Sequence, residues 1–132
     1  MVKRVAMVFG IVFLLIGILG IVSPGGMSMG ADPAPAMLLG LFPINLLHNL
    51  VHLSFGVWGL FASRSFAGAK LYAQVSGVVY LVLALCGLFI PTTFGLIPNS
   101  GNDIVLHAVF GLVLAGVGYT AKETMATPST AM

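Results

Sequence analysis

Charged side chains are scarce in this sequence. Only 6% of its 132 residues are Asp, Glu, Lys or Arg, whereas 59% are hydrophobic, and the mean hydropathy is +1.13. Such a composition excludes an ordinary soluble globule and indicates a protein whose solvent is lipid. The five cations form no basic stripe, so the net charge of +2 does not indicate a nucleic-acid partner. The length allows one domain, residues 1–132.

Cysteine is almost absent as well. The single Cys86 lies in an apolar run, which excludes an intrachain disulfide and a thiolate metal cluster. The sequence also lacks paired carboxylates, an activated nucleophile and a glycine-rich phosphate loop after a strand. We therefore expect that the protein is not an enzyme.

Long apolar runs are what the sequence has in abundance. A helix needs about 20 apolar residues to cross a bilayer, and only helices or closed barrels satisfy their backbone there. We expect connections at residues 24–43, 64–70 and 91–102, which are rich in Gly, Pro, Ser, Asn or charge. The predicted fold is an all-α polytopic membrane protein, with transmembrane helices at 5–22, 44–63, 71–90 and 103–120.

The charges support four spans. With four spans, every cation falls on one side of the membrane, and the other side carries Asp32 and Asp103. By the positive-inside rule, both termini are then cytoplasmic. The cations are Lys3, Arg4, Arg64, Lys70 and Lys122.

The sequence contains an internal repeat. Residues 40–56 and 95–111 share the pattern Gly-Leu-[Phe/Ile]-Pro-x4-[His/Asp]-x3-His-x2-Phe-Gly at an offset of 55, and the first and third helices match at an offset of 67. We therefore predict two duplicated hairpins, about 1–66 and 67–132, related by a pseudo-two-fold axis along the membrane normal. The matches at the second offset are Gly10, Phe13, Gly20 and Pro24 with Gly77, Tyr80, Gly87 and Pro91.

All three histidines lie in the repeated stretch. His48 and His52 have i,i+4 spacing and share a helix face, and so do Asp103 and His107. The repeat pairs His48 with Asp103 and His52 with His107. If both faces point at the axis, these side chains form two layers about 6 Å apart.

Three interpretations of this cluster stay open. Imidazole, carboxyl and amide groups can form an interhelical hydrogen-bond network, here with the amides of Asn45, Asn49 and Asn102. Asn102 or Asp103 is also a candidate for the cap of its helix. The second interpretation is that the cluster holds a cofactor. The third is that it belongs to a transport path, but the polar groups of such a path normally continue across the bilayer. The cofactor is a metal such as Zn or Fe on His48, His52, Asp103 and His107, or a haem or other tetrapyrrole on His48, His52 or His107.

Three runs carry a resemblance: NLLHNLVHLSFGVWG at residues 45–59, VVYL at 78–81 and GNDIVLHAVFG at 101–111. With these runs the chain resembles the bacterial domain-of-unknown-function family 4383, a family of small membrane proteins. The resemblance implies four transmembrane helices in a bacterial inner or photosynthetic membrane, and it implies no activity. Residues 24–37 match no pattern.

Our interpretation is a small integral membrane protein in the lipid bilayer, acting as a non-enzymatic structural or accessory component of a membrane assembly. It would dock other membrane-protein subunits or a second copy through apolar helices and glycine seams. The alternative is an intramembrane haem-, tetrapyrrole- or metal-binding protein. Whether residues 37–43 extend the second helix across Pro43 or form a separate interfacial turn is open.

Overall fold

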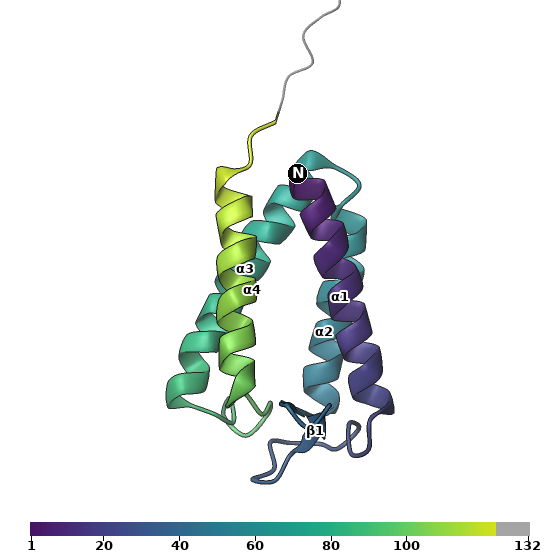
Figure 1. Ribbon diagram of the computed structural model, residues 1–132, viewed down its shortest axis with the longest axis vertical. Coiled ribbons are helices and arrows are strands. Elements are labelled where there is room, and N and C mark those ends of the chain that lie inside the picture. Colours follow the sequence, from purple (N-terminus) through teal and green to yellow (C-terminus); the bar gives the residue numbers. More distant parts are fainter. Residues whose placement is uncertain (124–132) are drawn as a thin grey trace, which may run out of the picture.

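The computed structural model describes residues 1–123 and is built of two helical hairpins with a small β-ribbon at one end (Figure 1). In each hairpin the two helices pack closely along one another, α1 with α2 and α3 with α4. The ribbon is antiparallel, with Met37 opposite Pro43. The elements are α1 (Val2–Val22), β1 (Ala36–Leu38), β2 (Phe42–Ile44), α2 (Leu46–Ala62), α3 (Phe66–Phe89) and α4 (Asn102–Thr120).

The helical architecture that the apolar runs predict is confirmed. Within residues 1–123, α1, α3 and α4 are each long and apolar enough to cross a membrane, and α2 is a shorter apolar helix of 17 residues. The helix bounds differ from the predicted spans because hydropathy marks only the apolar segment, whereas a helix can include polar residues at its ends. α1 begins at Val2 and so includes Lys3 and Arg4.

The connection predicted at residues 64–70 is wrong for most of its length. α3 already begins at Phe66, because the Ser65 hydroxyl caps the helix by accepting a hydrogen bond from the Gly68 N–H at 3.0 Å. Lys70 therefore lies within the helix, where its ammonium group donates to the Ala121 carbonyl at 3.0 Å. The low hydropathy of residues 64–70 therefore does not mark the end of a helix.

Residues 37–43 do not extend α2. They form most of the β-ribbon, with Pro43 in β2, and α2 begins only after Asn45. Proline lacks the N–H that a helix interior needs, but it is tolerated at the edge of a two-stranded ribbon.

Glycines let the two helices of each hairpin approach closely. A Cβ on Gly56 would lie 2.7 Å from the Leu14 backbone nitrogen, and a Cβ on Gly111 would lie 2.8 Å from that of Leu81. A larger side chain at either position would push the helices apart. Small residues are what allow membrane helices to make van der Waals contact along their length.

Aromatic side chains fill the space where the two hairpins meet. The rings of Phe13 from α1 and Tyr80 from α3 are stacked, with centroids 5.0 Å apart and an interplanar angle of 9°. Phe55 and Phe110 meet these rings edge-on, at 5.6 Å from Tyr80 and Phe13 respectively. The central contact thus joins two residues that the sequence repeat makes equivalent.

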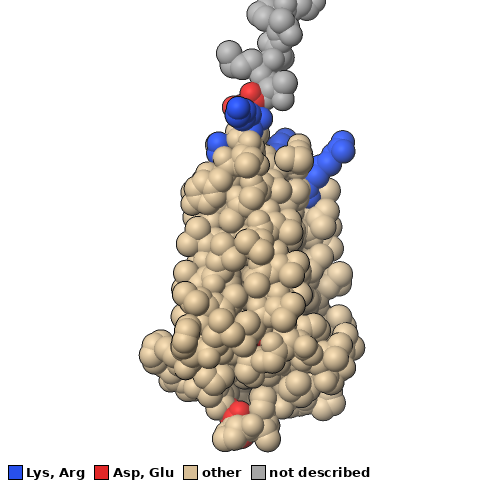
Figure 2. All heavy atoms as spheres, turned by 60° about the vertical axis from the view of Figure 1, so that its left-hand side comes forward, with Lys and Arg blue, Asp and Glu red and all other residues tan. Residues whose placement is uncertain are grey.

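The two ends of the bundle differ in their chemistry. Lys and Arg gather at the end that carries the N-terminus (Figure 2). At the opposite end, the connections of the two hairpins are bonded together: the Ala31 N–H donates to the Gly95 carbonyl at 3.1 Å, and the Asn45 amide donates to the Leu96 carbonyl at 2.7 Å. This second end also holds the histidines.

Candidate functional site

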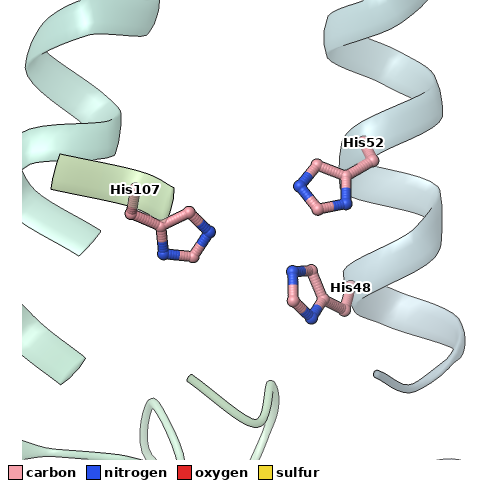
Figure 3. A group of neighbouring side chains, drawn as sticks. All are labelled: His48, His52 and His107. Atoms are coloured by element: carbon pink, nitrogen blue, oxygen red, sulfur yellow. The ribbon is translucent and has the colours of Figure 1, made fainter. Parts of the chain in front are cut away.

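Three buried imidazoles converge between the hairpins. His48 and His52 project from α2 and His107 projects from α4, so that their rings face one another (Figure 3). One ring nitrogen from each residue lies within 4.8 Å of those of the other two. Each residue is at most 4% exposed. The structure therefore brings together all three histidines that the repeat predicts.

Two of the three rings are oriented by hydrogen bonds. His48 Nδ1 lies 3.0 Å from the Pro43 carbonyl oxygen, and His107 Nδ1 lies 3.1 Å from the side-chain oxygen of Asn99. Because both partners are acceptors, Nδ1 carries the proton in each ring and Nε2 keeps a free lone pair. Histidines that bind metals are usually held in this way.

Asn99 is itself fixed in place. It is 1% exposed, and its amide donates to the Leu83 carbonyl at 2.7 Å, which turns the amide oxygen toward His107. The sequence motifs did not single out Asn99. The signal that could have found it is a departure from the repeat, since Asn99 corresponds to the apolar Ile44 at the offset of 55.

His52 shows the result of this departure. Its Nδ1 has no hydrogen-bond partner within residues 1–123. Its repeat counterpart, His107, has Asn99 as a partner, whereas the residue that corresponds to Asn99 is Ile44, which offers no polar side-chain atom. The ring of His52 is held by stacking on Phe13 instead, with centroids 5.7 Å apart.

Asp103 lies beside His48, in keeping with their pairing by the repeat. One carboxyl oxygen, Oδ2, is 3.8 Å from His48 Nδ1, which is too far for a hydrogen bond. That oxygen has no hydrogen-bond partner in the described part of the chain, although Asp103 is only 2% exposed. The convergent group thus consists of the three imidazoles, with a buried carboxyl group at its edge.

Asn45 and Asn49 have structural roles. Asn45 caps α2 by accepting from the His48 N–H at 2.8 Å, and its amide donates to the Gly30 carbonyl at 2.8 Å. Asn49 faces a different neighbour, as its position on the helix predicts, and donates to the Gly26 carbonyl at 2.8 Å. These bonds tie α2 to the connection that precedes it.

The prediction that Asn102 or Asp103 caps α4 is wrong. Gly101 occupies the cap position with φ of 59°, and no side chain caps this end of α4. A positive φ suits glycine, which has no Cβ. The side chain of Asn102 instead reaches the other hairpin and donates to the Leu41 carbonyl at 3.1 Å.

The chain matches the model of a known protein family. The model of a family described as "Domain of unknown function (DUF4383)" matches residues 3–120, which include every residue of the site and all of the helices except Val2. The chain belongs to this family. Comparisons with curated proteins and with solved structures found no match.

The DUF4383 chain has a cavity on each side of its histidines. One, of about 170 Å³, lies between α1 and α4 and reaches His48, His52 and Asp103. The other, of about 20 Å³, lies between α2 and α3 and reaches all three histidines. Because the family description carries no activity, the function of this DUF4383 chain has to be argued from the imidazoles and from these cavities.

Proposed function

We propose that the chain is an integral membrane protein of four transmembrane helices, built by duplication of a hairpin, that binds one divalent transition-metal ion between its halves. The observation that carries the metal site is the convergence of three buried imidazoles whose ring nitrogens lie within 4.8 Å of one another. Three neutral imidazoles suit Zn²⁺, Fe²⁺ or Cu²⁺, and three protein ligands leave a further coordination position open.

Matched contacts support the duplication. The centroids of Phe13 and Phe55 are 6.3 Å apart, and those of their counterparts Tyr80 and Phe110 are 6.4 Å apart. The close approaches at Gly56 and Gly111 involve Leu14 and Leu81, which also correspond. Such agreement across the hairpins is what a pseudo-two-fold axis along the membrane normal would produce.

The position of the cations supports a fourth span. If α2 crosses the bilayer beside α1, then Arg64 lies on the same side as Lys3 and Arg4, and the positive-inside rule places both termini in the cytoplasm. A bacterial inner membrane is the setting that this topology suits. In right-side-out vesicles of Cys86→Ala protein, a membrane-impermeant maleimide should label Asp32→Cys and not Arg64→Cys. Labelling of Arg64→Cys instead would contradict the topology.

A metal fits this site better than a haem. A cavity of about 150 Å³ holds one benzene-sized ring, and the cavities that reach the histidines measure about 170 and 20 Å³. A tetrapyrrole is several times larger than one ring. A single ion needs only that the three Nε2 atoms close in to metal-ligand distance, about 2.0–2.1 Å for Zn–N.

Cobalt titration tests the metal site, because tetrahedral Co²⁺ on imidazoles has a visible spectrum. We expect one Co²⁺ per chain in detergent, displaced by Zn²⁺. His107→Ala, which removes the only ligand from the second hairpin, should weaken binding by about 10-fold or more. The matched control is Asn102→Ala, an exposed polar residue at the start of the same helix, which should bind normally. Equal Co²⁺ spectra in the wild type and His107→Ala would refute the site.

A non-enzymatic structural or accessory role in a membrane assembly is the second candidate. It is favoured by the buried asparagines, whose amides bond to backbone carbonyls and so hold the fold together. Other subunits or a second copy would then contact the apolar outer face. Native mass spectrometry of gently extracted protein should show a stoichiometric complex, whereas a metal-loaded monomer would favour the first candidate.

A further inference from the structure

The two cavities beside the histidines occupy corresponding places in the repeat. The cavity between α1 and α4 and the cavity between α2 and α3 are lined by equivalent positions of the two hairpins. The equivalent pairs are Ile16 and Leu83, Leu106 and Val51, Phe42 and Ile97, Ile44 and Asn99, His48 and Asp103, and His52 and His107.

In the smaller cavity, a protein side chain is the hydrogen-bond partner of His107. There the Asn99 side chain bonds to both His107 Nδ1 and the Leu83 carbonyl. The remaining cavity volume is about 20 Å³, which is space for about one water molecule. On this side of the site, His107 and Asn99 therefore need no ligand, and the cavity has no room for one larger than water.

The larger cavity differs in the hydrogen bonding of its polar groups. Ile44 stands where the other side has Asn99. Asp103, which lines only this cavity of the two, and His52, which lines both, carry buried polar atoms (Oδ2 and Nδ1) that have no hydrogen-bond partner among residues 1–123. A buried polar atom without a partner is unfavourable, because it has lost its hydrogen bonds to water and gained none in their place. The rest of the lining is apolar, and it comes from α1, α4 and the β-ribbon.

We propose that the cavity between α1 and α4 binds the ring of a lipid-soluble phenol or quinol, whose hydroxyl group hydrogen-bonds to Asp103. The volume of about 170 Å³ fits one six-membered ring. A hydroxyl group can donate a hydrogen bond to the Asp103 carboxyl group, whose Oδ2 has no partner among residues 1–123, and it can also accept one. Leu39, which is 76% exposed, also lines the cavity, so a ligand can reach the cavity from outside the protein beside the β-ribbon.

This proposal does not depend on the metal. It rests on the cavity and on the two polar atoms, and it is tested on metal-free protein in nanodiscs. The probe is tritiated 4-pentylphenol, and the comparison compound is 4-pentylanisole, which has the same ring and tail but no donor. We expect the phenol to bind the wild type roughly 10-fold more tightly than the anisole, after subtraction of empty nanodiscs.

Variants of one helix locate the binding. Leu106→Phe places extra volume in the cavity and should weaken phenol binding roughly 10-fold. The matched control, Val113→Phe, makes a similar addition on the exposed face of α4 and should leave binding within about 2-fold. Asp103→Leu should abolish the preference for phenol over anisole.

Two results would overturn the proposal without any variant having to fold. They are equal binding of phenol and anisole by the wild type, and binding no greater than that of empty nanodiscs. Unchanged phenol binding by a folded Leu106→Phe protein would also overturn it, because the ligand would then lie elsewhere. A positive Co²⁺ titration with negative phenol binding would leave the metal site standing alone.

Discussion

The two hairpins meet along two seams, one between α1 and α4 and one between α2 and α3. Equivalent positions of the repeat line the cavities in these seams, yet the cavities measure about 170 and 20 Å³. One substitution between the halves accounts for much of the difference in polarity. Asn99 meets the hydrogen-bonding needs of His107, whereas Ile44 leaves those of His52 unmet. Equivalent positions of the two hairpins thus surround cavities that differ in volume and in the hydrogen bonds of the histidines.

The packing of helix against helix should be equally sensitive to larger side chains in the two hairpins. Gly10→Leu and Gly77→Leu each force a side chain against the backbone of the partner helix. We expect each to destabilise the protein by about 2–3 kcal/mol, since overpacking typically costs that much. Unfolding in mixed micelles with increasing SDS, followed by circular dichroism, measures the effect.

Gly116→Leu is the control for these substitutions, because a Cβ at Gly116 meets no heavy atom within 4 Å in the described chain. It should change the free energy of unfolding by less than about 0.5 kcal/mol. If only one of Gly10→Leu and Gly77→Leu were destabilising, the two hairpins would not share the same packing.

Asn99→Leu should weaken the seam between α2 and α3, which holds the smaller cavity. It removes the partner of His107 Nδ1 and the donor to the Leu83 carbonyl, so we expect a loss of about 2 kcal/mol in the free energy of unfolding. Ile44→Leu at the equivalent position should cost less than about 1.5 kcal/mol, because it only reshapes an apolar contact. Equal losses would mean that the Asn99 hydrogen bonds contribute nothing.

Much of this fold follows from the sequence, because each apolar run has only one way to satisfy its backbone in lipid. The repeat also identifies the three histidines and the stacked pair of Phe13 and Tyr80. Asn99 could not be identified in this way, since its importance depends on a hydrogen bond between positions eight residues apart in a bend of the chain. The start of α3 at Phe66 was missed because Ser65 caps it outside the apolar segment.

Tyr80→Phe would make the stacked pair of rings identical in the two halves. The Tyr80 hydroxyl is buried and has no partner in residues 1–123. Its removal should raise the free energy of unfolding by up to about 1 kcal/mol, because a desolvated polar group is lost. If chemical denaturation showed instead that Tyr80→Phe lowers the free energy of unfolding by more than about 1 kcal/mol, the hydroxyl group would have a partner.

Ile44→Asn should give the seam between α1 and α4 the hydrogen bond that Asn99 supplies to the seam between α2 and α3. Of these substitutions, it should change the free energy of unfolding least. The new amide can bond to His52 Nδ1, and this gain of about 1 kcal/mol offsets lost apolar burial of similar size. Nitrogen NMR of the His52 ring should report a protonated, hydrogen-bonded Nδ1, as at His107. Phenol binding should fall at the same time; an unchanged His52 spectrum would contradict the equivalence of the seams.

The double donation by Asn45 has a consequence for how the protein is made. Its amide bonds to Gly30 in its own hairpin's connection and to Leu96 in that of the other hairpin. During synthesis, the first hairpin is complete before Leu96 has left the ribosome, and one Asn45 hydrogen then has no carbonyl to bind. Arrival of the second hairpin supplies that carbonyl and, with His107, the third imidazole. The site therefore cannot assemble before the second half of the chain is in place.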